Sequence, residues 1–98
     1  MIDLDGPIEG PITATRDTAL WGSVSGDVVI RSGVRLELYG KVLGNLIVEQ
    51  GGVALVRGSV SGTVVNRGAH VVVFGRAGSI RDEGEQAAQI APDAETEP

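Results

Sequence analysis

Glycines recur along this chain at nearly constant intervals, in three sets. The sets are Gly22, Gly40, Gly58 and Gly75; Gly26, Gly44, Gly62 and Gly78; and Gly33, Gly51 and Gly68. Successive members of the first set are evenly spaced, except that the last interval is one residue shorter than the others. Self-similarity at a short fixed period is the sequence signature of a repeat architecture. The spacing therefore predicts a repeat architecture.

Between the glycines, branched aliphatic residues alternate with polar residues at the period of two that is typical of β-strands. The residues of inward parity are Val24, Val28, Ile30, Val34, Leu36 and Leu38, then Val42, Leu46, Val48, Ala54 and Val56, then Val60, Val64, Val71 and Val73. We expect glycine to supply a positive φ at three corners per repeat, so that the chain returns beside itself. The sequence therefore predicts an all-β fold, a single-stranded parallel β-solenoid of triangular section with about 18 residues per coil.

Three segments differ in how well they keep the repeat. Residues 1–21 reproduce the glycine spacing with an interval two residues too short, which predicts a degenerate N-terminal capping coil. Residues 22–80 form the regular body of the solenoid. Residues 81–98 contain six acidic side chains and one arginine, so the net charge of −5 lies there, and they predict an acidic flexible tail.

The composition excludes several classes of protein. The chain has no cysteine, so it has no disulfide, thiolate metal site or cysteine nucleophile. It contains no apolar run of about 18 residues and no secretory signal, so we expect no integral membrane segment and a cytoplasmic location. A neutral body with an acidic tail lacks the basic surface that nucleic-acid binding requires.

No group of residues indicates chemistry. Lys41 is the only lysine, and no glycine-rich loop places it to hold a phosphate. Asp27 and Asn45 occupy equivalent corner positions, where we expect hydrogen-bonded side chains rather than a calcium site, because the calcium-binding nonapeptide pattern is missing. The sequence therefore predicts no catalytic residue, cofactor or metal, and a protein that is not an enzyme.

One resemblance is to the left-handed hexapeptide-repeat acyltransferases, in which an aliphatic residue leads each six-residue unit and a histidine is the base. The corners here fall at unequal steps along the chain, which departs from that strict period. His70 is the only histidine, and its outward parity predicts a solvated strand residue.

The chain more closely resembles the bactofilins. The motif Gly-x-Val-x-Gly-x-Val occupies residues 22–28 and 58–64, and Gly-x-Val-x-Gly-x-Leu occupies residues 40–46. The resemblance covers residues 22–80. It implies a right-handed parallel β-helix that stacks end to end into nonpolar filaments without nucleotide and serves as a bacterial cytoskeletal scaffold. We therefore expect a homo-oligomer or homopolymer.

The ends of the predicted solenoid decide whether it assembles, because an open end presents unpaired strand groups and apolar side chains. The candidate assembly residues are Ile8 and Ile12 at the first end and Ala77 and Ile80 at the second. Pro7 and Pro11 each remove a backbone donor at the first end, as an edge-blocking device would. The sequence leaves open whether the two ends are joints or caps.

Two outward columns are candidate partner surfaces. The first column contains Trp21, Tyr39, Arg57 and Phe74, and the second contains Val29, Ile47 and Val65. The aromatic column either stiffens the solenoid as a ladder or binds a protein partner. The apolar column indicates lateral contact or cover by a terminal segment. An alternative function is therefore a small capped binding module, such as an inhibitor or immunity-type protein.

Overall fold

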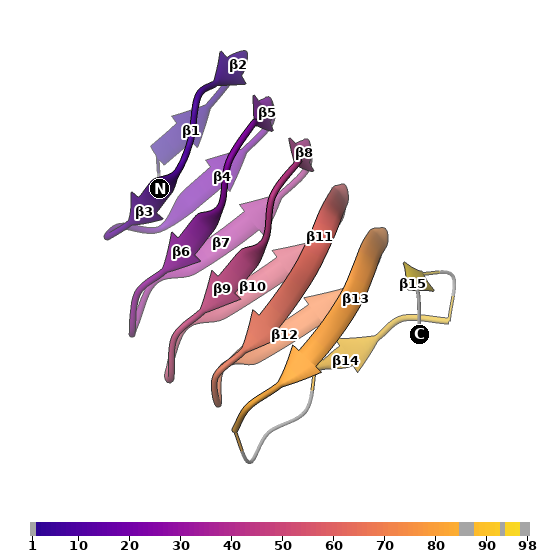
Figure 1. Cartoon of the computed structure of the whole chain (residues 1–98). Helices are drawn as coiled ribbons and strands as arrows, with labels where there is room; N and C mark the ends of the chain where they lie inside the picture. The colour runs from indigo at the N-terminus through magenta and orange to yellow at the C-terminus, as the bar shows by residue number, and fades with distance from the viewer. Residues whose placement is uncertain (1, 85–87, 93, 97–98) are drawn as a thin grey trace.

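The chain folds into a stack of parallel coils. In a computed structural model, which describes residues 2–84, 88–92 and 94–96, the described residues contain strands and no helix. The strands form a β-solenoid of about 5 turns with roughly 17 residues per turn, which confirms the predicted fold class. Figure 1 shows the coils side by side, with the N-terminal coil at one end of the stack and the C-terminal strands at the other.

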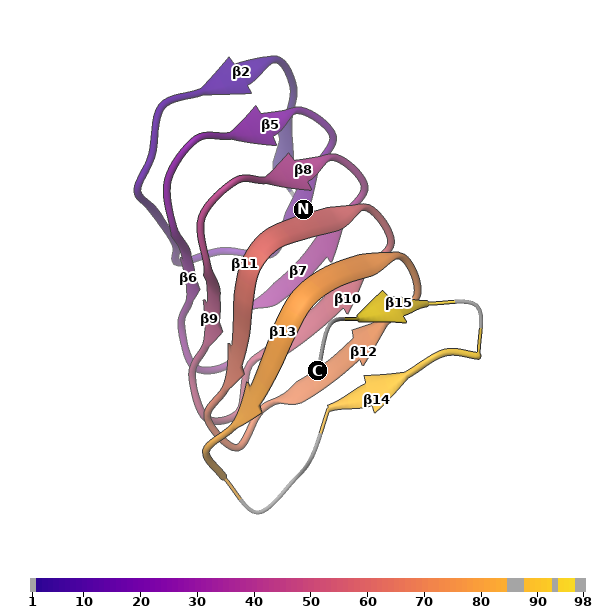
Figure 2. The same cartoon turned by 45° about the vertical axis from the view of Figure 1, so that its right-hand side comes forward.

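Each coil contributes a strand to each of three faces, and every described pairing is parallel. The first face contains β1 (Ile2–Leu4), β4 (Thr18–Leu20), β7 (Arg35–Leu38), β10 (Val53–Val56), β12 (His70–Val73) and β14 (Gln89–Ile90). The second face contains β2 (Pro7–Ile8), β5 (Ser23–Val24), β8 (Lys41–Val42) and β15 (Glu95–Thr96), and the third contains β3 (Ile12–Ala14), β6 (Val28–Ile30) and β9 (Leu46–Val48). β11 (Ser59–Asn66) and β13 (Arg76–Asp82) each run continuously from the second face to the third (Figure 2).

The core is a set of aliphatic columns that run along the solenoid axis. All fifteen residues of predicted inward parity are buried, and the least buried of them, Val34, is 7% exposed. One column runs from Val28 through Leu46 to Val64, each directly opposite the next in a parallel pair. Because the strand period of two puts alternate side chains inside, the sequence pattern alone assigns the core correctly.

The predicted reason for the glycines is correct for one set and wrong for two. The described positive φ angles are at Gly6, Gly33, Gly51 and Gly68. At Gly33, with φ +77°, a Cβ would meet nothing within 4 Å, so the backbone conformation itself favours glycine. Gly40 has no positive φ, but a Cβ there would collide with the carbonyl oxygen of Gly22. Its set therefore consists of glycines because adjacent coils approach too closely for a side chain.

A one-residue deletion in the fourth coil (β10 and β11) is accommodated by a side chain. The corresponding corner of the third coil is closed by the backbone, where the Gly52 amide donates to the Glu49 carbonyl at 2.9 Å. In the fourth coil the Oδ1 atom of Asn66 instead accepts a 2.7 Å hydrogen bond from the Ala69 amide. Asn66 is fully buried, and this bond makes the tighter corner possible.

The predicted boundary at residue 80 is wrong for the described part of the C-terminal segment. β13 continues through Asp82, β14 pairs with β12, and β15 pairs with β13, so these residues begin a further turn rather than a flexible tail. Asp82 supports this turn, because its Oδ1 accepts from the Ala88 amide at 2.9 Å and from Asn66 Nδ2 at 3.3 Å. The alternation of apolar and polar side chains is lost in these residues, but hydrogen bonding between the main chains of paired strands does not require it.

Candidate interaction surfaces

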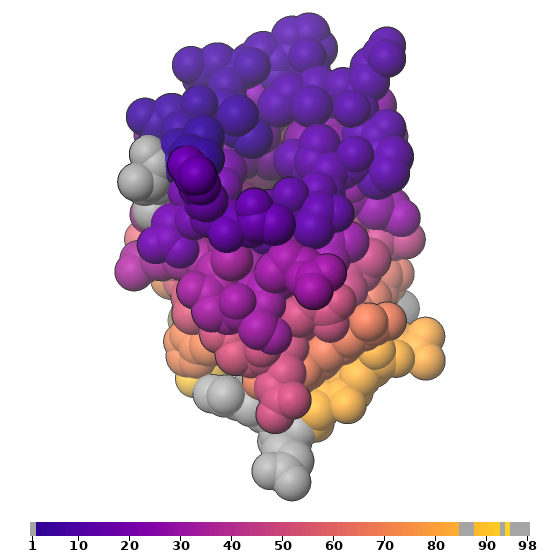
Figure 3. Space-filling view, turned by 90° about the vertical axis from the view of Figure 1, so that its left-hand side faces the viewer, coloured from indigo at the N-terminus to yellow at the C-terminus, as the bar shows by residue number. Residues whose placement is uncertain are grey.

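The N-terminal end of the solenoid exposes core columns that no described segment covers. β1 is the edge strand of the first face, and its residue Ile2 lies opposite Thr18 in an inward column that continues to Leu36. Ile2 is 41% exposed because nothing described stacks on it. The predicted assembly residues Ile8 and Ile12 are half-buried and pack against the core. Figure 3 presents this end, where side chains of the first coil surround a recess.

The C-terminal end differs from the prediction. Ala77 is only 1% exposed, since β15 pairs with β13 and places Thr96 opposite it. Ala77 is therefore not a surface for assembly, whereas Ile80 stays half-buried and packs against the core. The exposed apolar residue at this end is Ile90, which lies opposite Val73 in β12 and is 48% exposed.

Sequence reasoning missed Ile2 and Ile90, although both continue inward columns. Ile90 follows Val73 by the same interval that separates Val73 from Val56. This spacing could have identified Ile90 in spite of the acidic residues around it. The first coil consists of β1, β2 and β3. The sequence interval from Ile2 to Thr18 equals the shortened interval from Ile12 in β3 to Val28 in β6.

The aromatic column contains two pairs of side chains in contact along one edge. Trp21 and Tyr39 stack with ring centroids 4.1 Å apart and an interplanar angle of 7°. The guanidinium of Arg57 lies 4.7 Å from the centroid of the Phe74 ring, a cation–π contact. Each contact joins residues of adjacent coils, one repeat apart in the sequence. Trp21 and Phe74 are nevertheless 52% and 40% exposed, so the aromatic column also presents apolar surface to solvent.

Tyr39 is tied to its own strand as well as to Trp21. Its hydroxyl donates a 2.9 Å hydrogen bond to Oε1 of Glu37 in β7. This bond to the carboxylate, together with desolvation and the negative charge of Glu37, raises the pKa of Tyr39 above its ordinary value of 10.0. The neutral phenol is the form that donates this hydrogen bond, so the pair with Glu37 favours it over the phenolate.

The apolar column of Val29, Ile47 and Val65 lies in register across the third face and is half-buried. The described C-terminal strands pair at the end of the stack and do not cover this column. On one side of the column Arg67 forms ion pairs with Glu49 at 3.6 Å and with Glu83 at 3.2 Å. These pairs are largely exposed, so they contribute little stability but make that margin of the column polar.

A ladder of polar corner side chains forms the other margin of the same face. The backbone amide of Asn45 donates a hydrogen bond to Oδ1 of Asp27, and the backbone amide of Thr63 donates one to Oδ1 of Asn45, both at 2.8 Å. The hydroxyl of Thr63 lies 2.8 Å from that of Ser79, which extends the ladder to β13. This confirms the prediction of hydrogen-bonded corners at Asp27 and Asn45.

The structure assembles no recognisable catalytic or metal-binding group in the part of the chain it describes. His70 lies on the outer side of β12, exposed and opposite Val53, as its parity predicts. No group of three or more histidine, cysteine, aspartate or glutamate side chains among the described residues could hold a metal ion. Nor does any helix long and apolar enough to cross a bilayer occur within residues 2–84, 88–92 and 94–96.

Comparison with known proteins adds no family to this description. No family model matches the chain, and searches of curated proteins and of solved structures found no match. The surfaces described above are therefore the basis for any statement about function.

Proposed function

We propose that this protein is a noncatalytic scaffold that associates with itself through the ends of its solenoid. The observation that carries the proposal is that inward columns reach both ends without cover by any described residue, where Ile2 is 41% and Ile90 is 48% exposed. The same type of side chain is fully buried in the middle of the stack, as at Ile30. A second copy would bury these side chains in the way that each coil buries its neighbour.

The backbone supports the same proposal. β1 and β14 are the two edges of the six-stranded sheet, and among the described strands each pairs on one side only. An unpaired parallel edge is a template for another strand. The bactofilin-like glycine motifs agree with an end-to-end arrangement.

Light scattering and electron microscopy of the same purified sample test the proposal. We expect masses well above the 10.1 kDa of one chain, increasing with concentration, and elongated particles in micrographs. Ile90→Asp places a charge on the exposed end column and should reduce the mass. Leu43→Asp is the matched control, because Leu43 is 53% exposed on the side of the third coil and away from both ends. A monomer at all concentrations would overturn the proposal, as would equal effects of the two variants.

A second candidate function is a binding module that uses the aromatic column. The exposure of Trp21 and Phe74 beside Arg57 favours it, because aromatic residues and arginine are enriched at the centres of protein interfaces. Replacing Tyr39 and Phe74 by serine tests this candidate. Loss of a binding partner from a folded solenoid supports the module, whereas unchanged partner binding contradicts it.

A further inference from the structure

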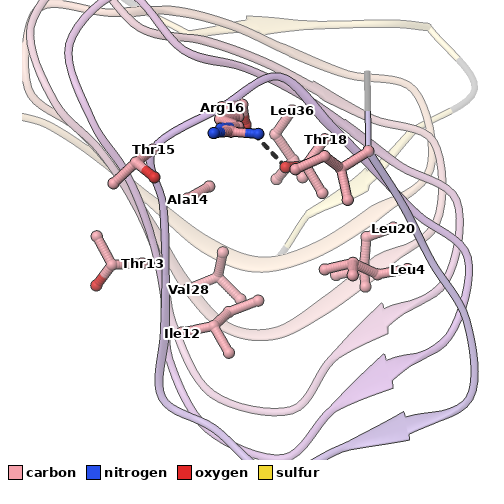
Figure 4. Close-up of a pocket in the computed structure, with 11 residues that line it drawn as sticks. Leu4, Ile12, Thr13, Ala14, Thr15, Arg16, Thr18, Leu20, Val28 and Leu36 are labelled. Atoms are coloured by element: carbon pink, nitrogen blue, oxygen red, sulfur yellow. Dashed lines mark hydrogen bonds between the residues drawn. The ribbon is translucent and has the colours of Figure 1, made fainter.

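The first coil of the solenoid contributes to an apolar cavity. Its volume is about 320 Å³, within the range of small-molecule sites, and it opens at the N-terminal end of the solenoid (Figures 3 and 4). Apolar side chains from three coils line it, including Leu4, Ile12, Leu20 and Leu36. Protein interiors are normally packed without such voids, so the cavity needs a structural cause.

The cause is the shortened corner between β3 and β4. Ala14 pairs with Ile30 and Thr18 pairs with Leu36, so the chain from Ala14 to Thr18 is two residues shorter than the chain from Ile30 to Leu36 beside it. In later coils the equivalent place holds an apolar side chain that fills the interior, such as Val34 or Ala69. In the first coil Arg16 takes this place.

Arg16 leaves the interior empty and puts a cation at its opening. Its side chain is exposed and contributes to the lining, while its carbonyl accepts a 2.8 Å hydrogen bond from the hydroxyl of Thr18. Its guanidinium has no ion-pair partner among the described residues. The neighbouring carboxylate of Asp17 accepts a hydrogen bond from the backbone amide of Arg35. Figure 4 shows Arg16 and Thr18 on one side of the cavity, with Ile12, Val28 and Leu4 on the other.

We propose that this cavity binds a small aliphatic carboxylate, with the alkyl chain among the apolar side chains and the carboxylate at the Arg16 guanidinium. The apolar part of the lining supplies surface against which a hydrocarbon chain would be removed from water. Arginine binds a carboxylate through parallel N–H donors, which selects an anionic head over a neutral one. The cavity opens at the end where the proposed self-association would place a second copy, so ligand and second copy should compete for this end.

Calorimetric titration with hexanoate, octanoate, decanoate and 1-octanol tests the site. Each added methylene should tighten binding about fourfold until the chain exceeds the cavity. Octanoate should bind more tightly than octanol. Arg16→Gln should weaken octanoate binding about three- to tenfold and leave octanol unchanged. The matched control is Arg31→Gln, which removes an exposed arginine one coil further along and outside the lining.

Ala14→Leu should fill the cavity and abolish binding of both ligands. If that variant does not fold, the exposed Arg16→Gln variant still decides the outcome. No detectable octanoate binding would overturn the proposal, as would binding that neither chain length nor Arg16→Gln alters. Light scattering of the same samples reports assembly separately. Titration of Ile90→Asp, in which the proposed contact between ends is weakened, leaves the cavity uncovered and distinguishes a chain that does not bind ligand from a cavity covered by a second copy.

Discussion

Two leucines in one coil allow a direct measurement of the inward and outward alternation. Leu46 in β9 is fully buried and lies between Val28 and Val64 in an inward column. Leu43 directly follows β8 in the same coil and is 53% exposed. The same substitution, leucine to alanine, thus removes the same atoms from opposite environments of the third coil.

Leu46→Ala removes buried methyl groups and leaves a cavity with closely packed walls. Such substitutions cost about 2–5 kcal/mol, and a loss of about 3 kcal/mol in a chain of this size lowers Tm by about 12–24 °C. Leu43→Ala should change stability by no more than about 0.5 kcal/mol, because much of its side chain is already in water.

Thermal and urea unfolding followed by circular dichroism measure both losses. The fluorescence of Trp21, the only tryptophan, gives an independent probe of the same transition. Equal losses for the two variants, or a larger loss for Leu43→Ala, would refute the assignment of the core.

Three further outcomes follow from the corner geometry and from Tyr39. Gly33→Asn should lower the free energy of unfolding by less than about 1 kcal/mol, because asparagine tolerates positive φ. Gly40→Asn should prevent folding, because its side chain would collide with the adjacent coil. Comparable unfolding curves for the two variants would contradict this. Asn45→Leu should cost about 1–3 kcal/mol in urea unfolding by orphaning a backbone amide, and Asn45→Asp should retain most of that stability. Titration of Tyr39 by ultraviolet absorbance should give a pKa above 10.0 that Glu37→Gln lowers. The stabilisation from this pair is complete below the unfolded pKa and is lost as the pH rises through the folded pKa.

The sequence was sufficient to predict the fold and the core. Glycine spacing located the corners, and alternation placed residues such as Val28 and Leu46 inside, because both patterns are local consequences of strand geometry. The same patterns place Tyr39 next to Trp21 and Phe74 next to Arg57, since residues one repeat apart stack in a parallel solenoid.

The ends were harder to predict, because their structure depends on pairing between segments and not on side-chain pattern. The acidic composition after Ile80 gave no indication of β14, the strand in which Ile90 lies opposite Val73. The cause of the glycines at positions such as Gly40 was also hidden, since a collision with the backbone of the next coil becomes visible only in three dimensions. The position of Arg16 was not predicted either. Its equivalence to Val34 and Ala69 depends on the pairing of β4 with β7 and of β10 with β12.

The molar mass of the purified chain as a function of concentration tests self-association most directly. Multi-angle light scattering should give a mass several times 10.1 kDa that increases with concentration, and Ile90→Asp should lower it while Leu43→Asp does not. A constant mass of 10.1 kDa for the wild-type chain across the whole range would contradict the proposed scaffold.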